Sequence, residues 1–236
     1  MRTQLLAATA LSTTIGFLVP GLALAQGPTP FDWSGFYTGI SAGVVTSQST
    51  IDFDGFDGSD YPKHLDLPAL GQDGTVRFGY NWQTGQFVYG LEQDLSIVSL
   101  SGTHSGGTAP FGNYSVQDSL NTLLSMRARF GVAFDRLMVF ATAGVAAGHS
   151  SFVSDVGYNL APASASDTVL GGVFGGGMEY AVTDNLSLTA TALYYDLASL
   201  HGVGDAGYDA VGFHVPYSAT YSPHGAVFEA GLNLHF

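Results

Sequence analysis

The chain of 236 residues contains no cysteine, which excludes a disulfide-linked scaffold and any chemistry that depends on a thiolate. Basic residues are also scarce, because six Lys and Arg face nineteen Asp and Glu and give a formal net charge of −13. Such a chain is a poor partner for nucleic acid, whose phosphates are bound by clustered basic side chains. Only 11% of the residues are charged while 46% are hydrophobic, and the composition indicates a single domain.

The chain also lacks an internal apolar run of roughly 20 residues, the length that a membrane-spanning helix needs. At the N-terminus, Arg2 precedes a short apolar run that ends in Ala23-Leu24-Ala25. This pattern predicts a secretory signal peptide over residues 1–25 that is cleaved after Ala25. We then expect a short periplasmic segment over residues 26–34 and a folded domain over residues 35–236.

The mean hydropathy is nevertheless positive, at +0.22. A secreted apolar chain without a spanning helix can satisfy its backbone hydrogen bonds in lipid as a closed β-barrel. Alternating stretches support this interpretation, since Val76, Phe78 and Tyr80 share one face of a strand and Arg77 lies on the other. Alternation of this kind is typical of a membrane barrel, whose apolar face meets lipid while its polar face lines the lumen.

Eight stretches have the period and the length of tilted membrane strands, which need about 9 to 11 residues. They cover residues 35–46, 73–82, 86–98, 116–134, 137–150, 169–182, 186–200 and 225–236. They predict an all-β fold, an eight-stranded antiparallel up-and-down transmembrane β-barrel. Gln93 falls on the lipid-facing phase, and the register of the fifth stretch stays open because both of its phases are apolar.

The predicted connections alternate between short and long. Tight turns are expected at residues 83–85, 135–136 and 183–185, and long loops at 47–71, 99–115, 151–168 and 201–222. Outer-membrane barrels have short periplasmic turns and long extracellular loops. We therefore expect four long extracellular loops and place both chain ends in the periplasm.

Aromatic side chains cluster where the predicted strands meet the membrane surfaces, as in the aromatic girdles of outer-membrane barrels. The expected periplasmic girdle consists of Phe31, Trp33, Phe36, Trp82, Phe134, Tyr180 and Phe236, and Phe152 and Tyr194 are expected near the outer rim.

Several segments resemble a known family. They are Trp33-Ser-Gly-Phe-Tyr-Thr-Gly, Met126-Arg-Ala-Arg-Phe-Gly-Val-Ala-Phe-Asp-Arg-Leu, Ala141-Thr-Ala-Gly-Val-Ala and the final Phe. Together they resemble the outer-membrane β-barrel surface antigens and porin-like proteins of alpha-proteobacteria, which are related to OmpA-type transmembrane domains and opacity-protein barrels. The resemblance implies a barrel in the Gram-negative outer membrane more firmly than any one activity, because family members have varied roles.

Seven ionisable residues lie on the predicted lumen face. They are Arg77, Glu92, Asp94, Arg127, Arg129, Glu179 and Glu229. An eight-stranded barrel has room for little more than its own side chains, so buried charges there must pair. We interpret them as a structural ion-pair network, and the alternative is a narrow gated path for water or small ions.

The last strand carries apolar side chains in one phase, among them Phe228, Leu232, Leu234 and the terminal Phe236. This pattern resembles the signal by which barrel-assembly machinery recognises its clients. The alternative is a last strand with an apolar face and no signal. Deleting Phe236 distinguishes the two, because a signal predicts a larger effect on assembly than on stability.

The predicted loops are acidic and carry scattered histidines at His64, His104, His201 and His214, among aromatic residues. Imidazole can bind haem iron, so haem or another ligand at the loops is one hypothesis, although no metal-ligand spacing is present. The segment that starts at Asp52 fails the calcium-loop pattern at Phe56 and Lys63. We assign no metal and no cofactor.

The string Gly39-Ile-Ser-Ala-Gly fits a nucleophile motif but falls in a predicted strand instead of a strand-to-helix turn, so no catalytic residue is assigned. His149 and Ser150 near the outer rim resemble part of a lipid-deacylase triad, but the sequence cannot place the acid. The sequence thus predicts a structural and surface-interaction protein without turnover chemistry, with a porin-like channel and ligand capture as alternatives. Expected partners are outer-membrane lipid, lipopolysaccharide, the assembly machinery and host or cell-surface ligands, and the oligomeric state stays open.

Overall fold

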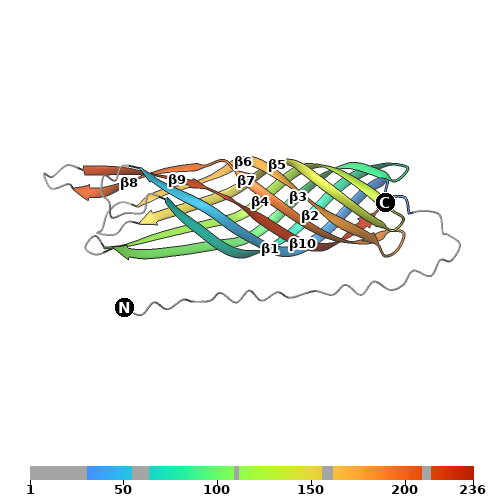
Figure 1. Ribbon diagram of the computed structural model, residues 1–236, viewed down its shortest axis with the longest axis horizontal. Helices are drawn as coiled ribbons and strands as arrows, with labels where there is room; N and C mark the ends of the chain where they lie inside the picture. The colour runs from blue at the N-terminus through green and yellow to red at the C-terminus, as the bar shows by residue number, and fades with distance from the viewer. Residues whose placement is uncertain (1–30, 55–63, 109–111, 156–161, 209–213) are drawn as a thin grey trace, which may run out of the picture. The chain divides into compact units, whose positions relative to one another are not determined.

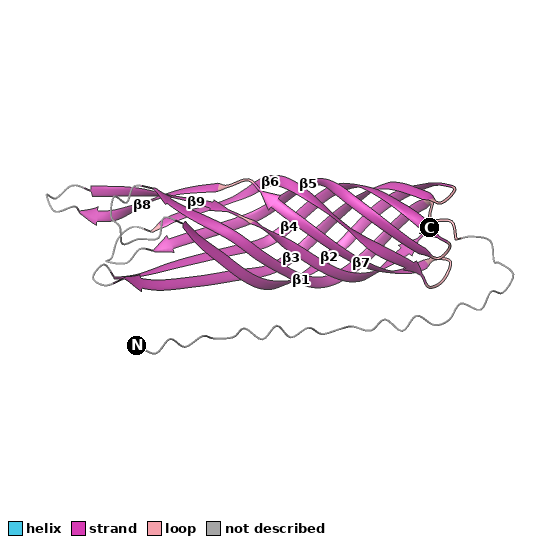
Figure 2. Ribbon diagram, viewed as in Figure 1, coloured by secondary structure: helices cyan, strands magenta, loops and turns pink. Residues whose placement is uncertain are grey.

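The computed structural model describes residues 31–54, 64–108, 112–155, 162–208 and 214–236. Within them the chain forms antiparallel strands wound into a barrel (Figures 1 and 2). The strands are β1 Gly35–Asp54, β2 His64–Thr84, β3 Phe87–Thr108, β4 Gly112–Phe134, β5 Leu137–Asp155, β6 Ala163–Ala181, β7 Leu186–Leu197, β8 Leu200–Tyr208, β9 His214–Ser222 and β10 His224–His235. No helix among these residues combines the length and apolarity needed to cross a bilayer. The predicted signal peptide and residues 26–30 lie outside the described residues.

Eight of the described strands close the ring, which confirms the predicted fold. β1 to β7 pair in sequence order, and β10 pairs with both β7 and β1. β8 continues β7 after a break at Ala198 and Ser199, and β9 leads into β10 across Pro223. β8 therefore prolongs β7, and β9 prolongs β10. The hairpin that they form lies beyond the end of the β1–β10 ladder. The tight connections at one end of the barrel match the predicted periplasmic turns.

The long loops are the main correction to the sequence interpretation. Residues 47–54, 64–71, 99–108 and 151–155 are strand, as are most described residues of the last predicted loop. The connections between these strands, at 55–63, 109–111, 156–161 and 209–213, lie largely or wholly outside the described residues. The prediction failed because it ended each strand where the lipid-facing apolar residues end. A strand that continues into water keeps its inward apolar phase and changes only its outward phase to polar.

The outward face shows where this change occurs. Near the periplasmic turns it is a belt of exposed apolar side chains that includes Phe36, Ile40, Phe78, Leu95, Met126, Phe130, Val145, Phe174 and Leu188. Farther along the strands the outward residues become polar, at Gln48, Ser99, Asn121, His149 and Asp196. We place the outer membrane surface at this change and call the part of the barrel beyond it the extracellular extension.

The structure also fixes two uncertain positions. Gln93 is exposed on the lipid-facing side, as its phase predicted. In β5, Met138 and Phe140 point inward while Val139 and Val145 point outward, which settles the open register of the fifth strand.

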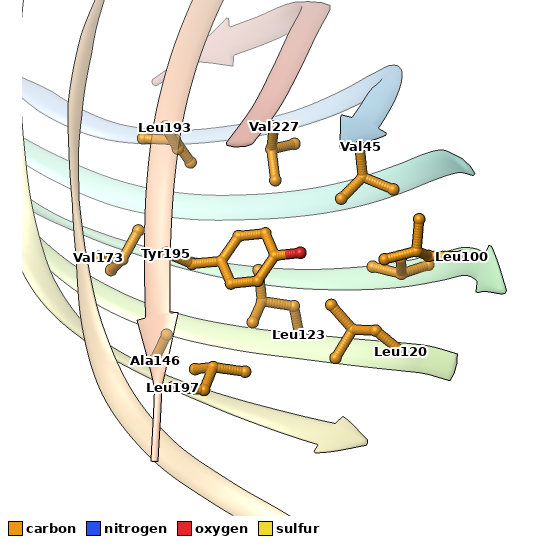
Figure 3. Close-up of a cluster of buried hydrophobic side chains, with 11 residues drawn as sticks. Val45, Leu100, Leu120, Leu123, Ala146, Val173, Leu193, Tyr195, Leu197 and Val227 are labelled. Atoms are coloured by element: carbon orange, nitrogen blue, oxygen red, sulfur yellow. The ribbon is translucent and has the colours of Figure 1, made fainter. Parts of the chain in front are cut away.

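Three apolar clusters fill the barrel interior at different heights. The periplasmic plug consists of Phe31, Trp33, Val88, Ala133, Met138, Phe140 and Ala181. The middle cluster contains Val45, Val98, Leu100, Leu120, Leu123, Ala146, Val173, Leu193, Tyr195, Leu197 and Val227, which converge from opposite walls (Figure 3). The outer cluster lies in the extracellular extension and includes Ile51, Leu67, Phe152, Tyr217 and Tyr221. The barrel interior is therefore packed with apolar side chains at three levels.

Three of the predicted girdle residues belong to these clusters, so their assignment was wrong. Phe31 and Trp33 lie in the periplasmic mouth, where Trp33 Nε1 donates to the backbone O of Asp135 at 3.1 Å and the Phe31 N–H donates to Asp135 Oδ1 at 3.1 Å. Phe152 is buried in the outer cluster. The two plug residues share the odd-numbered phase of the inward Tyr37, and the sequence analysis did not extend that phase back beyond the first strand.

The other predicted girdle residues do lie on the outside. Phe36, Trp82, Phe134, Tyr180 and Phe236 are exposed near the periplasmic turns, which confirms that girdle. At the opposite rim, Tyr194 packs on Phe174 with ring centroids 5.4 Å apart.

The chain's two tryptophans allow a matched test of the plug. Trp33 is fully buried and Trp82 is 42% exposed to lipid. Trp33→Ala should lower the free energy of unfolding by about 3 kcal/mol or more, because it opens a cavity in the plug, whereas Trp82→Ala should cost much less. Urea unfolding of the refolded barrel in lipid vesicles measures both values. Equal losses for the two variants would contradict the packed plug.

Candidate functional site

The lumen charge network, defined as Arg77, Glu92, Asp94, Arg127, Arg129, Glu179 and Glu229, lies between the periplasmic plug and the middle cluster. Its members come from β2, β3, β4, β6 and β10. None of them is more than 6% exposed. Cross-strand register explains how they meet, because Arg77 is paired with Asp94 and Glu92 with Arg127. The alternation of side chains along each strand, on which the sequence analysis relied, therefore placed all seven on the lumen face.

The first half of the network is centred on Asp94. Arg77 donates to it through two nitrogens, Nε to Oδ1 at 3.0 Å and Nη2 to Oδ2 at 2.9 Å. Arg127 Nη2 donates to Asp94 Oδ2 at 2.6 Å and to Glu92 Oε1 at 2.5 Å. Arg77 Nη2 also reaches Glu229 Oε2 at 2.9 Å. Two-nitrogen contacts of this kind fix both position and angle, so these side chains join four strands, β2, β3, β4 and the closing strand β10, across the lumen.

The second half is centred on Glu179. Arg129 Nη2 donates to Glu179 Oε2, and its guanidinium lies 3.7 Å from the centre of the Phe140 ring. Ser187 and Asn233 also donate to Glu179 Oε1, at 2.5 and 2.7 Å. Every charge in this half thus has several polar partners, as a buried carboxylate requires.

Tyr37 joins the two halves. Its hydroxyl donates to Glu92 Oε2 at 2.6 Å and accepts from Arg129 Nη1 at 3.1 Å. His235 lies against the same region, with Nε2 3.1 Å from Glu179 Oε1 and its ring stacked on Tyr37 at 5.6 Å. The site assignment had omitted Tyr37, although it has the same inward phase as Trp33. His235 and Asn233 share the phase of Glu229, which is the signal that could have added them.

A further acid was also missed. Asp73 is 6% exposed and belongs to the inward phase that contains Arg77. The hydroxyl of Thr75 lies 3.3 Å from Asp73 Oδ2 and 2.9 Å from Glu229 Oε1, so Asp73 borders the network. Above these residues and below the middle cluster there is a void of about 10 Å³. Such a volume holds about one water molecule.

The predicted loop histidines are not brought together. His64 and His201 lie on the outer surface of the extracellular extension, and register places Asp52 of β1 and Thr220 of β9 between them. With neighbouring strands about 4.8 Å apart, their backbones are separated by about 14 Å, too far to share one metal ion. His104 is on the inward phase of β3, beside Gly102 and Asp118. The side chain of His214 lies outside the described residues. No group of three or more His, Cys, Asp or Glu among the described residues could hold a metal ion.

The proposed assembly residues share one lipid-facing surface of β10. Phe228, Leu232, Leu234 and Phe236 are all exposed there. β10 is also the strand that closes the ring against β1, and the Phe236 N–H donates to the Phe36 carbonyl at 2.9 Å. The position of these residues on the closing strand is thus established, while their recognition by other proteins stays a prediction.

Comparison with known proteins agrees with this architecture. The family model described as outer membrane protein beta-barrel domain matches residues 15–236. The chain belongs to this family. The 31 kDa outer-membrane immunogenic protein of Brucella melitensis biotype 1 is 31% identical over 198 residues, which cover 81% of this chain and 82% of that protein. The 22 kDa outer membrane protein of Rhizobium leguminosarum bv. viciae is 34% identical over 167 residues, or 71% and 65% of the two chains. The predicted alpha-proteobacterial resemblance and the outer-membrane location are confirmed.

Two solved structures share the fold alone. OprG, an outer membrane protein of Pseudomonas aeruginosa, matches with a TM-score of 0.52 and 10% identity, covering 86% of this chain and 96% of that one. The outer membrane protease OmpT of Escherichia coli matches with a TM-score of 0.51 and 10% identity, covering 86% and 97%. At this identity neither match carries an activity to this family member.

Removing one partner from the lumen charge network should lower the stability of the barrel strongly. Arg127→Met leaves Glu92 and Asp94 short of a partner in the lumen, and we expect a loss of about 3 to 5 kcal/mol in the free energy of unfolding. Arg136→Met is the matched control, because Arg136 pairs with the exposed Asp184 at a periplasmic turn. That variant should lose less than about 1 kcal/mol. Comparable losses in urea unfolding would show that the buried pairs are not needed.

A pH-dependent contact is expected in the extracellular extension. His64 Nδ1 lies 2.7 Å from Asp52 Oδ1, and this hydrogen bond raises the pKa of His64 above its ordinary value. Because the folded-state pKa is raised, the contact is fully present below the ordinary pKa and is lost as pH rises through the raised one. Asp52→Asn should lower the pKa of His64 in an NMR titration, whereas Asp167→Asn, on another strand, should leave it unchanged. A pKa that does not move in Asp52→Asn would contradict the contact.

Proposed function

We propose that this protein is a plugged outer-membrane scaffold that presents its extracellular extension to other molecules and conducts no solute. The observation that supports the proposal most strongly is the filling of the lumen. The periplasmic plug, the lumen charge network, the middle cluster and the outer cluster follow one another along the barrel. An ion would have to break charge pairs and then cross apolar layers, both of which are costly.

The surface of the extension supports an interactive role. Its described exposed residues include the acids Asp52, Asp54, Asp66, Asp155 and Asp167, and they include no Lys or Arg. Such a surface favours cationic partners and repels anionic ones. We therefore propose that contact with lipopolysaccharide phosphates runs through bridging divalent cations. A host or cell-surface partner is favoured by the immunogenic character in the printed name of the Brucella relative.

The competing functions have less support. Haem capture needs ligands that converge, whereas His64 and His201 are three strand spacings apart on the outer surface and His104 is on the inward phase. We also propose that the chain performs no turnover chemistry. Ser41 of the nucleophile-like string lies within β1, where its hydroxyl donates to Glu229 Oε2 at 3.0 Å and serves the lumen charge network.

Conductance separates scaffold from channel. We expect the refolded chain to show no discrete current steps in a planar bilayer. Arg127→Ala with Arg129→Ala should also be silent, because the apolar clusters above and below the network remain. Reproducible wild-type steps that change in this double variant would overturn the scaffold proposal in favour of a channel.

Assembly gives a second test. We propose that the apolar face of β10 is recognised by the barrel-assembly machinery. Phe236→Ala should reduce the amount of folded protein in the outer membrane severalfold while changing urea stability in vesicles by less than about 1 kcal/mol, since the side chain is 74% exposed. Leu188→Ala, at a lipid-facing position on β7, is the control and should affect assembly little. Parallel losses of assembly and stability in Phe236→Ala would remove the signal.

A further inference from the structure

The extracellular extension contains a seam that the membrane part of the barrel lacks. In the membrane every ring strand has a partner on both sides. Above it, β6 pairs with β5 on one side, but its ladder with β7 ends at Gly171. β8 pairs with β9 and ends the sheet order on its other side. Residues 163–170 of β6 and the free edge of β8 therefore face each other without a ladder between them.

Strand geometry shows which backbone groups of β6 enter this seam. The Leu170 carbonyl accepts from the Ala198 N–H at 2.8 Å, so Leu170 directs its backbone groups to the β7–β8 side. Residues two apart in a strand point to the same side. Thr168, Ser166 and Ser164 therefore also direct their N–H and C=O groups into the seam. The Thr168 N–H is held by the Asp167 side chain at 2.7 Å, and no backbone hydrogen bond joins the described parts of β6 and β8.

The hairpin on the other side of the seam is anchored to β1, because Ser218–Ser222 of β9 pair with Thr50–Asp54, but few hydrogen bonds join it to β5 and β6. A Cβ on Gly202 would lie 3.0 Å from the Ser164 carbonyl O, so β8 touches β6 at that point. The Tyr217 hydroxyl of β9 reaches across the interior, where it accepts from the Ala163 N–H at 2.9 Å and donates to the Ser154 carbonyl at 2.8 Å. Pro223 and the break at Ala198 and Ser199 separate the hairpin from the ring strands. Opening of the Tyr217 bonds would therefore let the β8 edge move away from β6 while β9 stays paired with β1.

We propose that this seam is a docking site for an extended, cationic polypeptide segment, which adds a strand to the β6 edge. The inference rests on the scaffold function proposed above and names its partner class. Unpaired N–H and C=O groups in a row are complementary to another extended backbone. Natural edge strands are often protected by Lys, by Pro or by an inward charge; residues 163–170 contain no Lys or Pro, and Asp167 is their one charged residue. The acids Asp155 and Asp167 beside the seam favour a basic segment.

A second copy in the same membrane does not fit this edge. Two barrels in one membrane are related by an axis along the membrane normal, so their β6 strands would both run toward the periplasm. Such an axis brings identical edges together and places identical residues opposite each other. In a parallel ladder the hydrogen bonds are slanted, so the two strands must be offset along their length instead. A separate extended segment, which can run antiparallel to β6, meets no such constraint.

The probe is a fluorescein-labelled peptide of alternating Val and Lys, eight residues long, titrated into the refolded full barrel in neutral lipid vesicles. Its control has the same sequence with alternate backbone nitrogens methylated, which keeps the charge and removes donors to the ladder. We expect saturable anisotropy for the first peptide and at least tenfold weaker binding for the second, the loss expected for two hydrogen bonds. Equal binding of the two peptides, or no saturation by either, would overturn the proposal.

Variants locate the binding. Ser166→Pro removes one N–H that faces the seam and spares the β5 ladder, so the Val-Lys peptide should bind about tenfold more weakly. Ser166→Ala keeps that N–H and should bind as wild type does. Tyr217→Phe removes the hydroxyl that holds the hairpin, and binding should tighten severalfold because less of the free energy of binding opens the seam. Unchanged binding in Ser166→Pro, with circular dichroism showing a folded barrel, would place the peptide elsewhere. The conductance measurement is independent, so failure here leaves the scaffold proposal to be judged on its own.

Discussion

Closure of the ring by the β1–β10 ladder is the constraint on which the rest of the structure depends. In lipid no water can satisfy a free backbone N–H or C=O, so the sheet must have no edge in the membrane. Closing it with eight strands leaves an interior wide enough only for side chains. The charges placed there must therefore pair with one another, and Arg77 does so by bridging Asp94 of β3 and Glu229 of the closing strand. Ring closure and ion pairing thus reinforce each other.

The same constraint is relaxed beyond the membrane surface. Water can satisfy an unpaired strand edge in the extension, so the ladder between β6 and its neighbour can end at Gly171. The interior there is still closed to water by the outer cluster, and the Tyr217 hydroxyl joins the hairpin to the opposite wall. One chain therefore combines a sealed membrane barrel with an upper part that has free edges. This difference explains why we assign stability to the lower part and interaction to the upper part.

The success of sequence interpretation depended on whether phase alone decides a residue's position. Arg127, Arg129 and Glu179 were placed in the lumen correctly because a strand in lipid must turn its charged side inward. Trp33 was placed wrongly because it precedes the first strand, where the sequence analysis did not apply the phase that distinguishes a plug aromatic from a rim aromatic. The extracellular strands were predicted as loops because each predicted strand was ended where its lipid-facing apolar residues end, although a strand in water keeps only its inward face apolar. The three-dimensional partners of His64 and His201 depend on register across four strands, which no local pattern encodes.

The sequence by itself determined the class of fold, the location and the identity of the charges in the lumen, because the bilayer imposes a period of two and forbids unpaired backbone. Only the tertiary structure decided that Asp94 is shared by two arginines, that Phe31 and Trp33 plug the mouth, and that β6 and β8 leave a seam. Each of these depends on which residues of distant strands stand at the same height. That height is set by the register and stagger of the closed ring, a property of all eight strands together.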